Sequence, residues 1–331
     1  MKIAIDRDIP FLRGVFEPFA RTEYFGGSEM SHEDIRDADA LIVRTRTKCD
    51  AGLLDGSSVR FIATATIGTD HIDLDYCRAH GICIANAAGC NARGVLQWVG
   101  AVLVHLLHRR NMCPEELTLG IVGVGHVGGL VAEYAERWGF RTVCCDPPRE
   151  EREHLGFRTL EEVFAVADII TLHTPLDEST RHMVGSRLFA ETGRLPFVIN
   201  ASRGEVVDTE ALLASGAEFA ADVWEHEPDI DRRMLQRALL ATPHIAGYSL
   251  QGKANAAAMA VAAVAEFFSL PIAGWYPDGV ARSVPRPIGW NELCATIGDR
   301  YDIAAESGRL KSHPEDFERL RNSYAYREEY F

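Results

Sequence analysis

Three segments in the second half of the chain carry residue types that can act together on an alcohol. They contain Arg203, Glu227 and His244, and each follows an apolar run that predicts a strand. Parallel strands end at the same edge of an open sheet, where ligands bind. A histidine can accept a hydroxyl proton, a neighbouring carboxylate orients its ring, and an arginine can hold a substrate carboxylate by two parallel hydrogen bonds. The set therefore suits hydride transfer from a hydroxy acid.

Each of these three residues also has a simpler interpretation when it is taken alone. Arg203 can form a surface ion pair, Glu227 can be an exposed loop acid, and His244 can be a structural histidine after Pro243. Their joint occurrence after a dinucleotide-binding motif favours the catalytic interpretation over the three separate ones.

That motif is a G-x-G-x-x-G sequence formed by Gly123, Gly125 and Gly128, and it lies between a predicted strand and a predicted helix. The first glycine permits a tight turn, the second lets the backbone approach a pyrophosphate, and the third lets the helix pack on the sheet. The amides of His126 and Val127 at the start of the helix are the expected phosphate donors. A glycine-rich turn without a ligand is the alternative.

Asp146 ends the next predicted strand, where an acidic side chain accepts hydrogen bonds from the adenine ribose. A carboxylate there repels a 2′-phosphate, so the sequence favours NAD over NADP. The nearby Arg149 weakens this preference, and a solvated strand-end turn is the alternative for Asp146.

The elements around these motifs predict an α/β protein with two parallel-sheet lobes and a cleft between them. The strands expected from apolar runs are 2–6, 40–43, 61–64, 82–85, 119–122, 142–145, 169–173, 197–200 and 218–222, and the main helices are 73–80, 91–110 and 250–268. We expect a flavodoxin-like substrate lobe from residues 1–90 with a returning helix at 251–270, a Rossmann cofactor lobe at 91–250, and a short C-terminal element at 271–331.

The composition indicates a soluble protein of the cytoplasm. A formal charge of −14 argues against nucleic acid or an anionic membrane as a partner. The eight cysteines show no metal-ligand spacing, so we expect reduced, mostly buried thiols and no metal. No signal peptide or membrane-spanning run is apparent.

The motifs resemble those of the D-2-hydroxyacid dehydrogenase family, in the right order over most of the chain. The resemblance implies that His244 is the acid/base, Glu227 its partner and Arg203 the holder of the substrate carboxylate. It also places further residues against NAD: Thr174 and Asp222 on the nicotinamide and ribose side, Gly247 beside the cofactor, and Ala201 and Ser202 in the loop that leads to Arg203.

Finer motifs resemble the erythronate-4-phosphate dehydrogenase branch of that family, notably CDPPR at 145–149 and HIAGYSLQGKA at 244–254. This implies oxidation of 4-phospho-D-erythronate by NAD in vitamin B6 synthesis, with Thr45, Thr66 and Tyr248 contacting the substrate. The basic residues Arg44 and Arg46, with Lys48, can attract the phosphate or form a solvated basic edge. Strand alternation would place Arg44 and Arg46 on one face.

Two other functions remain open at this point: another enzyme of the family, such as 3-phosphoglycerate dehydrogenase, or a non-catalytic NAD(H)-sensing corepressor on the same fold. The resemblance further implies a homodimer, although the C-terminal element at 271–331 is shorter than the family's dimerisation domain.

Overall fold

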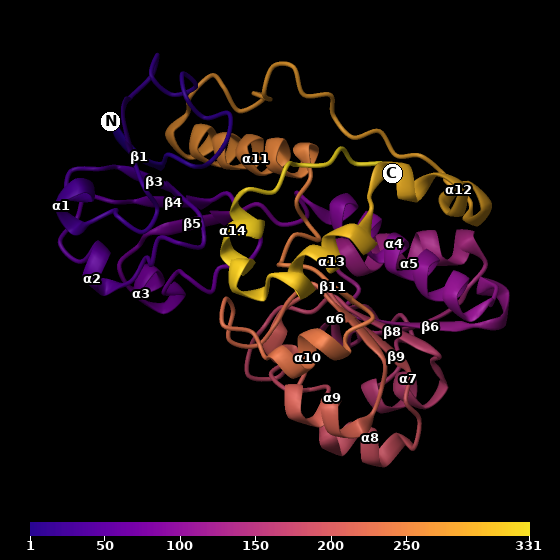
Figure 1. The fold of residues 1–331 in the computed structure, drawn as a ribbon. Coiled ribbons are helices and arrows are strands. Elements are labelled where there is room, and N and C mark those ends of the chain that lie inside the picture. The colour runs from indigo at the N-terminus through magenta and orange to yellow at the C-terminus, as the bar shows by residue number, and fades with distance from the viewer. The chain divides into compact units, whose positions relative to one another are not determined.

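The computed structural model describes residues 1–331 and divides into two compact units (Figure 1). Unit 1 comprises Met1–Asn91 and Leu250–Arg282, and unit 2 comprises Ala92–Ser249 and Ser283–Phe331. Within the segment 271–331, residues up to Arg282 belong to unit 1 and those from Ser283 onward belong to unit 2. No helix is long and apolar enough to cross a membrane.

Unit 1 is built on a five-stranded parallel sheet in the order β2-β1-β3-β4-β5. Helices α1 to α3 lie on one side of it and the long helix α11 on the other (Figure 1). Because both faces are covered, strands such as β3 and β4 are apolar throughout and buried. The elements are β1 (Lys2–Asp6), β2 (Arg21–Phe25), α1 (His32–Ile35), β3 (Ala40–Val43), α2 (Ala51–Leu54), β4 (Phe61–Thr64), α3 (Leu74–Ala79), β5 (Cys83–Asn86) and α11 (Leu250–Phe268).

Unit 2 is built on a six-stranded parallel sheet in the order β11-β10-β9-β8-β6-β7. The order reverses at β6, from which the chain runs first to β7 and then back across to β8, and a glycine loop leaves β6 at that point. The strands are β6 (Thr118–Val122), β7 (Arg141–Cys145), β8 (Ile169–Leu172), β9 (Phe197–Asn200), β10 (Phe219–Ala221) and β11 (Leu240–Ala241).

Ten helices and three short 3-10 turns complete unit 2. Helix α4 supplies a largely buried face to the core, and α5 begins at the glycine loop and ends at Gly139. The helices are α4 (Ala92–Arg110), α5 (His126–Trp138), α6 (Pro147–Glu153), α7 (Leu160–Val166), α8 (Ser186–Thr192), α9 (Thr209–Ser215), α10 (Arg232–Arg237), α12 (Trp290–Arg300), α13 (Ile303–Ser312) and α14 (Phe317–Asn322), and the 3-10 turns are Pro114–Glu116, Gly204–Val206 and Pro314–Asp316.

The C-terminal segment of unit 2 packs into the core of that unit. Phe331 is 1% exposed and its ring contacts those of Tyr134 and Trp138 on α5. Trp138 also donates to the carbonyl of Ile288 at 3.1 Å. A fully buried aromatic side chain contributes on the order of 2 kcal/mol to stability, so the end of the chain helps to stabilise unit 2.

Candidate active site

The three residues expected to do the chemistry leave neighbouring strands of the unit 2 sheet at the same edge. Asn200 of β9 pairs with Ala221 of β10, and Ala221 pairs with Ala241 of β11. Arg203 lies three residues after β9, Glu227 follows β10, and His244 follows β11. The parallel register thus delivers all three loops to one end of the sheet.

His244 and Glu227 are brought into direct contact. The His244 Nδ1 atom lies 2.8 Å from the Glu227 Oε2 atom, and both side chains are mostly buried. The other carboxylate oxygen, Oε1, accepts the backbone N–H of Trp224 at 2.9 Å. With Nδ1 held by the carboxylate, Nε2 is the nitrogen left to exchange a proton with a substrate.

The backbone at His244 is strained. Its φ of +58° lies in the left-handed region, which costs a non-glycine residue about 1–2 kcal/mol. Asp222 holds the turn in place: its carbonyl accepts the N–H of His244 at 2.7 Å, and its carboxylate accepts the next two amides. Conformations of this kind persist where the surroundings enforce them, commonly at functional sites.

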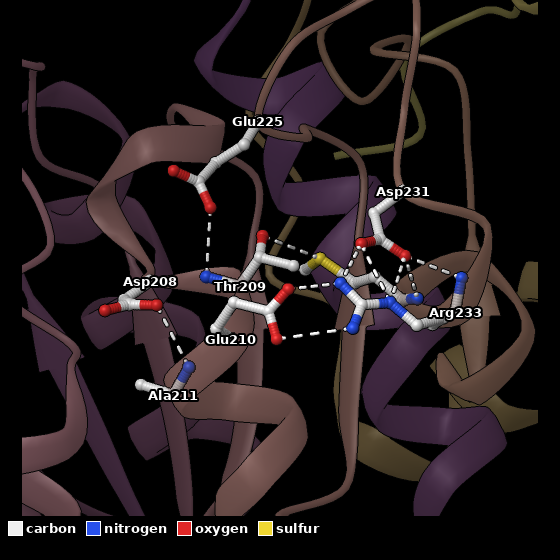
Figure 2. A network of polar contacts seen from close by, with 8 residues as sticks. Asp208, Thr209, Glu210, Ala211, Glu225, Asp231 and Arg233 are labelled. Carbon is white, nitrogen blue, oxygen red and sulfur yellow. Dashed lines mark hydrogen bonds and ion pairs between the residues drawn. The ribbon is translucent and has the colours of Figure 1, made fainter.

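The loop that carries Glu227 is anchored at both ends by the start of α9 (Figure 2). Before Glu227, the Glu225 carboxylate accepts the backbone N–H of Thr209 at 2.9 Å. After it, Asp231 binds Arg233, which also bonds to Glu210. Glu227 is therefore presented by a loop that is fixed on each side.

Arg203 lies in a tight turn held by Asn200, whose side chain bonds to the Arg203 carbonyl at 2.8 Å and to the Ser202 amide at 3.1 Å. The Arg203 Nη1 atom donates to the Ser202 carbonyl at 2.8 Å. The absence of a side chain at Gly204 lets this turn approach the Glu227 loop closely. A Cβ on Gly204 would lie 2.0 Å from the Trp224 carbonyl carbon. Any larger residue would push the two loops apart.

The glycine loop has the shape that a dinucleotide requires. Gly123 has a φ of +83°, and a Cβ on it would lie 2.7 Å from the His173 carbonyl oxygen. A Cβ on Gly128 would lie 1.9 Å from the Gly123 carbonyl oxygen, so the helix can pack this closely only with glycine. Nothing lies within 4 Å of a Cβ placed on Gly125, which leaves the N-terminus of α5 open to an anion.

Two polar groups around this loop fit a bound NAD. Thr174 Oγ1 is buried without a hydrogen-bond partner, as expected of an atom that a ligand would satisfy. The Asp146 carboxylate accepts the Val124 N–H at 2.8 Å and caps α6, and its remaining lone pairs suit ribose hydroxyls. Arg149, the residue that weakens the sequence's preference for NAD over NADP, binds Glu153 through a 2.6 Å ion pair.

Comparison with known proteins identifies the family. Residues 105–246 match the family model of the D-isomer-specific 2-hydroxyacid dehydrogenase NAD-binding domain. The chain is 45% identical to erythronate-4-phosphate dehydrogenase of Bacteroides thetaiotaomicron over 340 residues, covering 99% of this chain and 97% of that protein. It is 43% identical to the enzyme of the same name from Bacteroides fragilis strain ATCC 25285, again covering 99% and 97%. The chain belongs to the erythronate-4-phosphate dehydrogenase family.

Solved structures confirm the fold of this erythronate-4-phosphate dehydrogenase family member. The NAD-bound 3-phosphoglycerate dehydrogenase of Entamoeba histolytica superimposes with a TM-score of 0.68 at 24% identity, covering 85% of this chain and 99% of that one. The D-lactate dehydrogenase of Aquifex aeolicus, complexed with NAD and lactic acid, superimposes with a TM-score of 0.66 at 23% identity, covering 85% and 100%. The α/β class with two parallel sheets, expected from the sequence, is therefore confirmed.

The electrostatics of the pair in this family member favour an ionised carboxylate. Burial raises the pKa of Glu227, but the neighbouring His244, then the Arg321 guanidinium and the Trp224 N–H, outweigh burial and hold that pKa below its usual value. Glu227 is thus a permanent anion at neutral pH. A carboxylate in this state orients the imidazole and stabilises the imidazolium that forms when the histidine takes a proton.

Four other expected substrate residues lie in unit 1. Thr45 and Arg46 lie in an exposed turn after β3, and the Thr66 hydroxyl bonds to that of Thr64 at 2.6 Å. Arg44 binds the carboxylates of Asp6 and Asp8, each at 2.8 Å. Because β3 ends at Val43, the alternation expected for Arg44 and Arg46 does not hold: Arg44 is half-buried and Arg46 is exposed.

Two arginines of the C-terminal segment were missed by sequence reasoning. Arg321 of α14 lies 3.8 Å from Glu227 and 3.3 Å from the Tyr248 hydroxyl. Arg327 is buried and donates to the carbonyls of Ile245 and Tyr248, each at 3.1 Å. Both lie in the segment RNSYAYREEY at 321–330, which resembles part of the family's dimerisation domain, so the sequence did not point to them as residues of the active site.

Proposed function

We propose that this protein oxidises 4-phospho-D-erythronate to 2-oxo-3-hydroxy-4-phosphobutanoate with NAD, a step of pyridoxal 5′-phosphate biosynthesis. The observation that carries the proposal is the 2.8 Å contact between His244 and Glu227 at the strand edge that also presents Arg203. Relatives that bear this activity in their names match nearly the whole chain.

The roles of the residues follow from the chemistry of a 2-hydroxy acid. NAD, when bound, accepts the hydride that leaves C2. His244 takes the hydroxyl proton through Nε2, and the ionised Glu227 stabilises the imidazolium. Arg203 holds the C1 carboxylate by charge-assisted hydrogen bonds. The substrate thus becomes a 2-oxo acid, and one proton remains on the enzyme to be released to water.

The cofactor is held by unit 2 in this proposal. Gly123, Gly125 and Gly128 with the amides of His126 and Val127 receive the pyrophosphate, and Asp146 receives the adenine ribose. The nicotinamide side would meet a further set of residues, namely Thr174, Ala201, Ser202, Asp222 and Gly247.

Parallel assays test the substrate. Reduction of NAD, followed by absorbance, is measured with 4-phosphoerythronate, 3-phosphoglycerate and D-lactate. We expect the highest kcat/KM with 4-phosphoerythronate. A preference for 3-phosphoglycerate would assign the protein to that reaction instead, and binding of NAD without turnover of any of the three would favour the NAD(H)-sensing alternative.

The proposal includes a cytoplasmic homodimer, as the family resemblance implies. A net charge of −14 argues against nucleic acid or an anionic membrane as a partner and is compatible with a local basic site for an acidic substrate. Light scattering of the purified protein tests the dimer, and a monomer mass would contradict it.

A further inference from the structure

Arg321, in helix α14, extends into the site described above. Its Nη1 atom lies 3.8 Å from the Oε2 atom of Glu227, the same oxygen that contacts His244. Its Nε atom donates to the Tyr248 hydroxyl at 3.3 Å. The side chain is 21% exposed, so most of it is shielded from solvent.

The guanidinium of Arg321 has unused capacity for a ligand. It carries five N–H donors, and one of them, on Nε, makes a hydrogen bond within the protein. Its contact with Glu227 is too long for a hydrogen bond. No other hydrogen bond of the guanidinium is seen, and about a fifth of the side chain is exposed, which leaves its Nη donors for a bound anion. A mostly buried cation that keeps donors not used within the protein is suited to binding an oxyanion.

The position of Arg321 is enforced by the packing of the C-terminal segment. Phe317, at the start of α14, is 1% exposed. After α14, Arg327 bonds to the carbonyls of Ile245 and Tyr248 and to that of Gly94 at 3.0 Å. The segment is therefore tied to the turn that carries His244 and Tyr248, and Arg321 is held at the catalytic pair from both sides.

We propose that Arg321 binds the phosphate of the substrate and so determines the preference for a phosphorylated hydroxy acid. This inference rests on the proposed function. The substrate has two anionic ends, and Arg203 is assigned to the carboxylate. The ionised Glu227 would repel a phosphate nearby, and Arg321 offsets that charge while offering donors to the phosphate oxygens. Of the cations that the sequence suggests for the phosphate, Arg44 is already bound to two carboxylates and Lys48 pairs with Asp50.

The test compares two substrates that differ only in the phosphate. kcat/KM is measured with 4-phosphoerythronate and with D-erythronate for the wild type and Arg321→Gln. Because a charge-assisted hydrogen bond to the phosphate is lost, we expect kcat/KM to fall roughly 10- to 100-fold with the phosphorylated substrate. With D-erythronate we expect a change of less than about 3-fold, because no phosphate contact is lost.

A control on the same helix separates this effect from damage to α14. Arg319 is 66% exposed and pairs with Asp316, so Arg319→Gln should leave both kcat/KM values as in the wild type. If Arg321→Gln does not fold, Arg321→Lys serves in the same comparison, since it keeps the charge but loses the two-pronged geometry. It should show a smaller loss confined to the phosphorylated substrate.

The outcomes distinguish the inference from the proposed function. An equal loss with both substrates would overturn the inference, because Arg321 would then only position Glu227 and Tyr248. A wild-type preference for 4-phosphoerythronate that persists in Arg321→Gln would also overturn it and leave the proposed function intact. A wild type that does not prefer 4-phosphoerythronate over D-erythronate would contradict the proposed function itself.

Discussion

The carboxylate of Asp222 accepts the backbone N–H of Ile245 at 2.8 Å, one residue after His244. Its second oxygen accepts the N–H of Ala246 at 2.8 Å, and the Thr242 hydroxyl donates to the first at 2.5 Å. Asp222 is 1% exposed. The family resemblance places Asp222 beside the cofactor, but here its carboxylate holds the left-handed turn of His244. A contact with NAD would therefore use oxygens that already accept hydrogen bonds from this turn.

Replacing Asp222 with Asn should damage stability and turnover together. The amide group would direct N–H donors at backbone N–H groups, so at least one buried donor loses its acceptor. We expect a loss of about 2–3 kcal/mol in the free energy of unfolding and a lower kcat, because the turn at His244 relaxes. Urea unfolding and steady-state kinetics measure the two effects. Asp229→Asn, at an exposed position of the loop that carries Glu227, is the control. Wild-type stability in Asp222→Asn would refute the argument.

Replacing His244 with Asn should remove turnover and spare the cofactor. Loss of a general acid/base lowers kcat by about 100- to 10,000-fold, whereas the glycine loop that we propose receives NAD is formed by other elements. Glu227→Gln should give a smaller loss, because the imidazole stays but the charge that stabilises its protonated form is gone. Stopped-flow kinetics and NAD titration by fluorescence report the two properties. Near-normal turnover in His244→Asn would eliminate the acid/base assignment.

Much of the fold could be predicted because buried parallel strands read as continuous apolar runs. The bounds expected for β1, β3, β4 and β9 agree with the structure. β2 was missed, since it is an edge strand in which Arg21 is exposed and Glu23 pairs with Lys2. Two-residue β11 is too short to leave a pattern.

Only those residues of the candidate site that lie in local sequence motifs could be predicted. The G-x-G-x-x-G loop and the His244 turn have sequence contexts that follow from their backbone geometry. Arg321 has none, because its role depends on a short helix docking beside Glu227 across nearly one hundred residues of chain. The neutralisation of Arg44 by Asp6 likewise depends on two strands pairing side by side, which no spacing in the sequence reveals.

Replacing Asp146 with Ala should weaken NAD binding. The variant loses both the proposed ribose acceptor and the bond that holds the Val124 amide at 2.8 Å, so the glycine loop loosens as well. We expect the Kd for NAD to rise about 10-fold, which corresponds to about 1.4 kcal/mol. Calorimetric titration measures the Kd. Glu151→Gln, on the exposed face of α6, is the matched control. An unchanged Kd in Asp146→Ala would argue against the ribose role.

His173 should make the protein sensitive to mild acid. Burial lowers the pKa of its imidazole to about 3, and its Nε2 atom contacts the Thr171 hydroxyl at 2.9 Å. In the unfolded chain a histidine titrates near pH 6.5, so above that pH neither state binds the proton and nothing is lost. As the pH falls below 6.5, the unfolded state takes up the proton that the folded state refuses, and stability declines until the folded-state pKa is reached.

The contribution of His173 to the loss of stability in acid can be isolated with His173→Gln. The glutamine amide nitrogen can replace Nε2 in the contact with the Thr171 hydroxyl. Between pH 7 and pH 5 the histidine alone should cost the wild type about 2 kcal/mol of unfolding free energy, and the variant should be spared that part of the loss. Urea unfolding at the two pH values measures it, and His108→Gln, at an exposed position, should retain the full wild-type loss. An equal loss of stability in His173→Gln and the wild type on acidification would contradict this prediction. It would mean that the His173 imidazole accepts a proton in the folded state as readily as in the unfolded chain.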